Sequence, residues 1–304
     1  CAPDGEIDDA ARTAAARELA RLAAAGVPGA EPAQWYGLAP VSTDAPLFDT
    51  DATVPMSPST LQTVLDCPLR WLGERHGGSD PREVTSALGS LLHALIAEPG
   101  RSTEELARDL EKLWDALPFG SPWYARNELH RHLDMLAAFG EWRQHTRGEL
   151  TEVGTEVVVS GTVEVDEDTR VGIRGRADRV ERDAAGRLVI IDIKTGKTPV
   201  SKADAAEHAQ LAAYQLAVEE GLLGEGETPG GARLVYLAKT GRDGATVREQ
   251  DPLTSETAET WRAAMTSART DMTGPDYPAR RNTGCTHCPM LSNCPAHREP
   301  GARS

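Results

Sequence analysis

Three segments between residues 153 and 194 predict strands that follow one another directly along the chain. They read VGTEVVVSGTVEV, RVGIRGRADRVER and RLVIIDIK, patterns of alternation and of apolar β-branched residues that are typical of strands. The second and third segments are separated only by DAAG. We expect a hairpin with a three-residue loop, Ala184 to Gly186, in which Gly186 adopts the left-handed backbone conformation, because this is a common hairpin type. Asp183 then faces Arg187, and this pairing fixes the register of the whole hairpin.

This register places two acids opposite each other. Asp178 faces Asp192 with Cβ atoms roughly 5 Å apart, whereas a loop of two or four residues would place them on opposite faces of the sheet. Facing carboxylates repel, and a divalent cation bound by both would compensate, for which Mg²⁺ or Mn²⁺ suits the hard oxygen ligands. Lys194 shares a face with Asp192 and could hold an attacking water or a developing anion. The alternative is a solvated hairpin end with an incidental Asp–Lys pair.

The rest of the pattern predicts helices on either side of these strands. After an Ala-rich helix over 7–25 and an extended linker over 26–58, Ser57 suits an N-cap with Pro58 at the first helical position. Further helices are expected over 84–97, 103–148 with a break near 118–122, 202–220 and 255–272, and a fourth strand over 232–239. This order predicts an α/β or α+β domain, of which we favour α/β, with a mixed sheet flanked by helices.

The composition is that of a globular chain. Of 304 residues, 39% are apolar and 26% are charged. No run of about 18 apolar residues occurs, and the N-terminus has no signal-peptide pattern, so we expect a cytoplasmic protein without a membrane span. The net charge of −15 argues mildly against nucleic acid as a partner, although a local basic groove can lie on an acidic chain. The chain does not begin with Met, which suggests a fragment of a longer protein.

Three of the five cysteines cluster near the C-terminus. Cys285, Cys288 and Cys294 form a C-x2-C-x5-C run, which indicates a metal or iron–sulfur site. Because no secretion signal is present, we do not expect a disulfide framework. Cys67 lies far from this run in the sequence and, taken alone, could be a buried small hydrophobe. Cys1 lies in the linker and needs no role.

Together, these motifs resemble one nuclease family. GRAD with Asp178 and DIK with Asp192 and Lys194 look like the core of the PD-(D/E)xK nucleases, and HAQLAAYQLA resembles the Q-x-x-x-Y helix of their RecB-type branch. GSLLHALI resembles the upstream His helix of that branch, and SPSTLQTVLDCPLRW with CTHCPMLSNCP resembles its iron–sulfur form. RLAAAGVPGAEPAQWYGLAPVSTDAPL looks like the stretch that joins helicase to nuclease in actinobacterial RecB-like and AdnA/AdnB-type helicase–nuclease subunits.

The resemblance covers roughly residues 56–297 and implies a domain organisation. Residues 1–55 would be a helix and linker from an upstream helicase region, and residues 56–300 a nuclease domain with a restriction-endonuclease-like core. A helical insertion over about 101–149 and a cysteine cluster over 285–294 would complete this domain. A 4Fe–4S cluster would be held by four thiolates and would clamp the terminus: Cys67, Cys285, Cys288 and Cys294.

The resemblance also implies roles at the acid pair. His93, Asp178, Asp192 and the carbonyl of Ile193 would bind Mg²⁺ or Mn²⁺, and Lys194 would orient or activate the water.

Further residues would support this centre. Gln210 and Tyr214, at i and i+4 on one helix face, would brace the site or the DNA strand. Glu156 lies on the strand where relatives often carry an accessory acid, with Glu152 and Glu164 nearby.

Simpler interpretations remain open for several of these residues. His93 could be a satisfied core histidine, and Gln210 and Tyr214 could serve helix packing alone. Zinc competes with the iron–sulfur cluster because four cysteines suit either, and His287 or His297 could replace Cys67 in such a zinc site.

The implied function is metal-dependent DNA cleavage within a helicase–nuclease that processes double-strand break ends for recombinational repair. The parent would carry an ATP-dependent helicase and act with a partner helicase–nuclease subunit. Arg174, Arg176 and Arg179 are candidates for salt-sensitive contacts to DNA phosphates. Two alternatives are a DNA-end-binding domain whose nuclease site is silent and a zinc-stapled scaffold domain.

Overall fold

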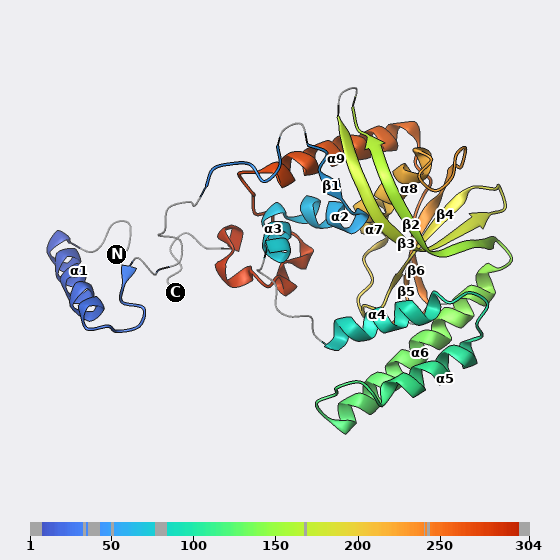
Figure 1. Cartoon of the computed structure of the whole chain (residues 1–304), viewed down its shortest axis with the longest axis horizontal. Coiled ribbons are helices and arrows are strands. Elements are labelled where there is room, and N and C mark those ends of the chain that lie inside the picture. The colour runs from blue at the N-terminus through green and yellow to red at the C-terminus, as the bar shows by residue number, and fades with distance from the viewer. Residues whose placement is uncertain are drawn as a thin grey trace. The chain divides into compact units, whose positions relative to one another are not determined.

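The computed structural model describes residues 8–32, 35, 43–49, 52–76, 84–166, 169–239, 241 and 244–297 (Figure 1). The chain divides into two compact units, Cys1–Ala45 and Pro46–Ser304. The first unit holds α1 (Asp9–Ala24), which begins where the Asp8 side chain accepts a hydrogen bond from the amide of Ala11. None of the residues in α1 is buried, so this helix has no core of its own.

The second unit is built on a mixed six-stranded sheet. Its order is β1 (Pro55–Met56), β3 (Arg170–Asp183), β4 (Leu188–Lys194), β5 (Pro229–Tyr236) and β6 (Thr246–Gln250), with β2 (Leu150–Glu164) paired to β3. The β2–β3, β3–β4 and β5–β6 pairs are antiparallel, whereas β1–β3 and β4–β5 are parallel. The expectation of an α/β fold with a mixed sheet and flanking helices is confirmed.

The hairpin between β3 and β4 has the register that the sequence predicts. Val180 pairs with Ile190 and Arg182 with Leu188, so both pairs continue the expected series. The Asp183 amide donates to the Arg187 carbonyl at 3.0 Å and closes the loop. Gly186 has a φ of +83°, which is the left-handed conformation that a three-residue loop needs.

Two hydrophobic cores lie on opposite faces of the sheet, and β4 contributes to both. Leu188 and Ile190 belong to the core that includes residues of α2 (Pro58–Asp66), α8 (Ala209–Glu219) and α9 (Ser255–Thr273). Ile191 and Ile193 belong to the core that includes α4 (Val84–Ile96), α5 (Thr103–Trp114) and α6 (Pro122–Thr146), which lie on the lower side of the sheet in Figure 1. Burial on both faces explains why this strand is an apolar run rather than an alternating one.

Several helix boundaries follow from local chemistry. Ser57 caps α2 with its side chain, as expected, and Pro58 occupies the first turn. The helix that begins at Pro58 ends at Asp66, because Pro68 disfavours helical backbone at Cys67, and a second helix, α3 (Pro68–His76), follows it. The predicted helix over 202–220 is likewise divided, into α7 (Lys202–Ala206) and α8.

Two short strands were not predicted. β1 falls within the expected linker, and β6 reads TVREQ, a charged segment without a strong strand pattern. Three 3₁₀ turns follow α9: Thr283–His287, Leu291–Asn293 and Pro295–His297. None of the helices among the described residues combines the length and apolarity needed to cross a membrane.

Candidate metal and catalytic site

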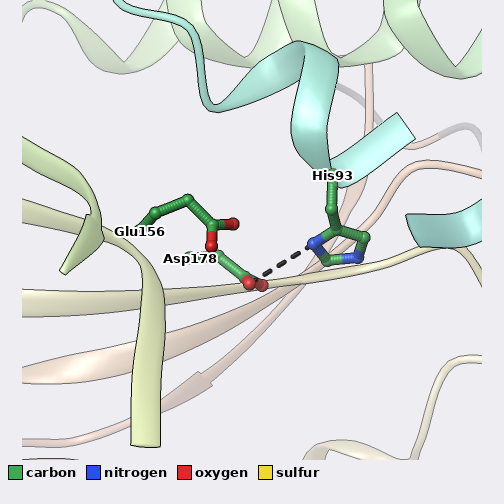
Figure 2. Close-up of side chains that lie close together, drawn as sticks. All are labelled: His93, Glu156 and Asp178. Carbon is green, nitrogen blue, oxygen red and sulfur yellow. Dashed lines mark ion pairs between the residues drawn. The ribbon is translucent and has the colours of Figure 1, made fainter. Parts of the chain in front are cut away.

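Three potential ligands from three separate elements meet beside the sheet. His93 projects from α4, Glu156 from β2 and Asp178 from β3, as Figure 2 shows. One ligand atom of each lies within 4.8 Å of the others. Nδ1 of His93 lies 3.3 Å from Oδ1 of Asp178. An imidazole nitrogen and carboxylate oxygens therefore converge at one point, and this donor set suits a metal ion.

Glu156 has an unusual backbone conformation. Its neighbours pair regularly with β3, Thr155 with Arg179 and Val157 with Ala177, so Glu156 lies opposite Asp178. Its φ is +50°, the one left-handed non-glycine residue in the described part of the chain. This conformation costs on the order of 1–3 kcal/mol and is concentrated at functional sites. The register itself places the side chains of Glu156 and Asp178 on the same face of the sheet, and the left-handed backbone marks this position as strained.

Asp192 lies deeper than these three residues, at the end of β4. It is buried, and its Oδ2 lies 2.7 Å from Nζ of Lys194. The side-chain amide of Gln210 donates to its Oδ1 at 2.6 Å and accepts from Lys194 at 3.1 Å. Asp178 reaches towards this strand as well, because its Oδ2 accepts from the Ile193 amide at 2.7 Å. Asp178 and Asp192 therefore lie on neighbouring antiparallel strands, although Asp192 is outside the group of three close ligands.

Gln210 and Tyr214 are one turn apart on α8 and both face β3 and β4. The Tyr214 hydroxyl donates to the Arg176 carbonyl at 2.7 Å, and its ring is buried in the core. The start of α8 is held from outside the helix. Gln62 on α2 accepts from the Ala209 amide at 2.8 Å, and Gln250 on β6 donates to the His208 carbonyl at 3.1 Å.

Two hollows adjoin the group of three. One, of about 390 Å³, lies between the N-terminus of α2 and α8 and is lined by Asp192, Lys194, Gln210 and Tyr214 among others. The other, of about 710 Å³, lies along α4 and is lined by Ser86, Ser90 and Glu156 among others. His93, Arg176, Asp178 and Thr195 line both hollows. The convergent residues thus stand between two spaces that are open to a substrate.

The family model of the PD-(D/E)XK nuclease superfamily matches residues 55–295. The chain belongs to the PD-(D/E)XK nuclease superfamily. No curated protein matches it. Among solved structures, one described as "Crystal structure of SSO0001" is 17% identical and covers 83% of this chain and 90% of its own, with a TM-score of 0.40.

Nucleases of this superfamily typically use a divalent metal, and the charges of this site fit one. Burial raises the pKa of Asp192, and repulsion from Asp178 adds to the rise while Lys194 opposes it. Burial works to lower the pKa of His93, but the hydrogen bond to Asp178 and the charges of Asp178, Asp192 and Glu156 together outweigh burial, and the net shift is upward. The carboxylates of Asp178 and Asp192 repel each other, and a cation would offset this repulsion with oxygen and imidazole ligands.

Lys194 is firmly a cation in this arrangement. Burial works to lower its pKa, but the charge and hydrogen bond of Asp192, together with the charge of Asp178, outweigh burial and the net shift is upward. The ammonium therefore acts as a hydrogen-bond donor at the end of β4.

The three arginines predicted to contact DNA differ in their surroundings. The prediction that Arg179 contacts DNA is wrong. Its side chain is 3% exposed and pairs with Glu152 and with Glu181, the latter at 3.0 Å. A buried guanidinium held by two carboxylates cannot reach a phosphate. Arg174 is exposed, and Arg176 pairs with Glu156 while remaining 66% exposed.

The four cysteines of the predicted cluster line one small cavity between α3 and the C-terminal turns. Their sulfurs do not form a group within 4.8 Å of one another among the described residues. Backbone amides of Arg70 and Arg280 lie 3.4 and 3.5 Å from the Cys67 sulfur, in hydrogen-bonding geometry. His297 also lines this cavity, whereas His287 is exposed and does not. Cys1 lies outside the described residues.

The C-terminal segment also docks through ordinary hydrogen bonds. The Asn282 side chain donates to the Asp66 carbonyl at 2.9 Å, and the Leu69 amide donates to the Pro278 carbonyl at 3.4 Å. These bonds bring the segment before Cys285 against the α2–α3 junction that carries Cys67.

Proposed function

We propose that the chain is a metal-dependent deoxyribonuclease that hydrolyses phosphodiester bonds. The observation that carries this proposal is the convergence of His93, Glu156 and Asp178 beside the buried Asp192–Lys194 pair. Three of these groups come from different elements, so their meeting is a product of the fold and not of local sequence. The two adjoining hollows provide room for nucleotides on both sides of a scissile phosphate.

His93, Asp178, Asp192 and the carbonyl of Ile193 would hold Mg²⁺ or Mn²⁺, with Glu156 as an accessory acid. The metal would polarise the scissile phosphate and lower the pKa of its water. Glu156 is the residue of this set whose role rests most on geometry, since its carboxylate lies close to His93 and Asp178 and its backbone is strained.

Lys194 would orient the attacking water and stabilise negative charge that develops on the phosphate. Gln210 holds both members of the pair, because its amide oxygen accepts from Lys194 and its amide nitrogen donates to Asp192. Tyr214 fixes the same helix to β3 through the Arg176 carbonyl and would brace the strand beside the site. Exposed Arg174 and Arg176 would contact DNA phosphates.

The test is cleavage of labelled DNA in Mg²⁺ or Mn²⁺ by the wild-type chain and by Asp192→Ala. We expect Asp192→Ala to lose cleavage while it keeps its fold and DNA binding, and to lose thermal stability in metal-free buffer because the Lys194 ammonium is left without its partner. Glu249→Ala is a matched control, since Glu249 is an exposed acid on β6 that pairs with Arg233 at 3.1 Å. Cleavage by Asp192→Ala at the wild-type rate would refute the proposal. A wild-type chain that binds DNA ends without cutting them would support the silent DNA-end-binding alternative.

We further propose that Cys67, Cys285, Cys288 and Cys294 hold a 4Fe–4S cluster that staples the two ends of the domain. The observation that supports a shared bound group is that all four cysteines line the same small cavity. Four thiolates suit either zinc or an iron–sulfur cluster, and the resemblance of the cysteine motifs favours the cluster. Anaerobically purified protein should be brown and contain iron, and a colourless protein with one zinc would favour the zinc-stapled scaffold instead.

The cellular context follows from the resemblance in the linker and cysteine motifs. We propose that the chain is the nuclease part of a cytoplasmic helicase–nuclease subunit that processes DNA double-strand breaks with a partner subunit. Degradation of linear duplex DNA by the parent protein, dependent on ATP and abolished by Asp192→Ala, would be the expected behaviour. Equal degradation without ATP would contradict this context and leave the nuclease proposal intact.

A further inference from the structure

We infer that Arg131, on α6 of the helical hairpin α5–α6, is a positioning residue for the catalytic end of β4. This inference rests on the proposed nuclease function. Arg131 lies 63 residues before Lys194 in the sequence and belongs to none of the motifs around the acid pair. Its Nη2 nevertheless donates to the Thr195 carbonyl, the first residue after Lys194, at 3.2 Å.

The position of Thr195 makes this bond consequential. Thr195 lines both hollows beside the site, together with His93 and Asp178. The preceding carbonyl, that of Lys194, already accepts from the Leu237 amide of the chain after β5 at 3.0 Å. Arg131 therefore holds the Thr195 carbonyl, which lies directly after the last β4 carbonyl that is bonded to the neighbouring chain segment.

The same residue links β4 to the helix that carries His93. A Cβ atom added to Gly89 of α4 would lie 3.1 Å from Oγ1 of Thr195, so the backbone of α4 lies close to the Thr195 side chain there. Gly89 and His93 are one helical turn apart and share a face of α4. By holding Thr195 against this face, Arg131 sets the distance between the imidazole on α4 and the acids on β3 and β4.

Arg131 is itself oriented by an acid on its own helix. Its Nη1 lies 3.1 Å from Oε2 of Glu128, whose side chain is 7% exposed. One nitrogen of the guanidinium thus pairs with Glu128, and the other reaches Thr195. The planar guanidinium of arginine can hold two separate acceptors in this fixed geometry, which neither lysine nor glutamine reproduces.

The variant that tests the inference is Arg131→Gln combined with Glu128→Gln. Removing both charges together avoids leaving Glu128 as an unpaired buried carboxylate, which would destabilise the fold for a trivial reason. The control is Arg143→Gln, since Arg143 is an arginine of the same helix whose Nη2 donates to another backbone carbonyl, that of Arg101, at 2.8 Å. Glu128→Gln alone serves as a second comparison because it keeps the bond to Thr195.

Two measurements separate positioning from general stability. In cleavage assays, the double variant should lose about tenfold to a hundredfold in kcat with KM within about twofold, because small displacements of reacting groups cost this much. Arg143→Gln, with a similar melting temperature, should keep the wild-type kcat. In hydrogen exchange, the Leu237 amide, which donates to the Lys194 carbonyl, should exchange faster in the double variant than in Arg143→Gln.

The outcomes distinguish this inference from the proposed function. If the wild-type chain does not cleave DNA, the nuclease proposal fails, and the exchange comparison alone decides whether Arg131 orders the end of β4. If the double variant matches Arg143→Gln in both kcat and exchange, Arg131 is not a positioning residue. If Glu128→Gln alone reproduces the full loss in kcat while the exchange of the Leu237 amide is unchanged, the effect belongs to Glu128 and the inference is overturned.

Discussion

Gln250→Leu should weaken the fold by about 2–4 kcal/mol and disturb the helix that carries Gln210. The buried Gln250 side chain donates to the carbonyls of Ala206 and His208, at 2.9 and 3.1 Å, and accepts from Gln215 at 2.9 Å. Leucine has a similar size but can replace none of these bonds. Each lost bond costs about 0.5–1.5 kcal/mol, and a buried polar group left without a partner costs more. Three lost bonds, partly offset by added apolar surface, give the stated range.

Urea unfolding followed by circular dichroism would measure this loss, with Glu249→Leu as the control. Glu249 is the neighbouring residue on β6, and its exposed ion pair with Arg233 is worth about 0–1 kcal/mol. Cleavage should be assayed where both variants are folded, and only Gln250→Leu should be slowed. A loss of less than about 1 kcal/mol for Gln250→Leu would show that these amides do not hold the start of α8.

Three further predictions concern the imidazole, the hairpin and the cysteines. The pKa of His93 is raised above 6.5 by Asp178, so protonated His93 stabilises the metal-free protein fully below pH 6.5. This stabilisation is lost as the pH rises through the folded-state pKa. Denaturation measured against pH should show the loss, and the His93→Gln variant should not show it. Gly186→Ala should lower the free energy of unfolding by about 1–2 kcal/mol in thermal or urea unfolding, because φ is +83° at this position and an added Cβ would meet no other atom within 4 Å. An unchanged free energy of unfolding would contradict the left-handed loop. Cys67→Ala and Cys288→Ala should each lower the melting temperature and the bound metal, since ligation free energy contributes to folding, and an unchanged metal content would remove the proposed staple.

The sheet at the centre of the site could be predicted from the sequence because its information is local. The loop DAAG fixes the β3–β4 register, and with it the pairing of strands that carry Asp178 and Asp192. The apolar run of β4 and the caps of α2 are likewise visible in short segments. Metal binding and the roles of individual residues at this site stay predictions.

Other features depend on contacts between distant segments and leave no local signal. Arg179 is buried because it pairs with Glu152 on β2 and Glu181 on β3. The residues next to Arg179 in the sequence do not reveal the contact with Glu152, so they suggested an exposed arginine. Gln62 and Gln250 hold α8 from 147 and 42 residues away, and neither belongs to a recognisable motif. The left-handed backbone at Glu156 has no sequence signal, because glutamate rarely adopts it.

The sequence of β4 also affects how prone the chain is to aggregate before it has folded. LVIIDIK is a short segment of high β-propensity, buried on both faces of the finished sheet and exposed until the sheet forms. Segments of this kind pair with other chains unless a charge interrupts them. Asp192 and Lys194 are the charges of this strand, so the residues proposed for catalysis also act as its gatekeepers against aggregation. Inactive variants with apolar residues at these two positions should therefore give less soluble protein than variants with asparagine or glutamine there.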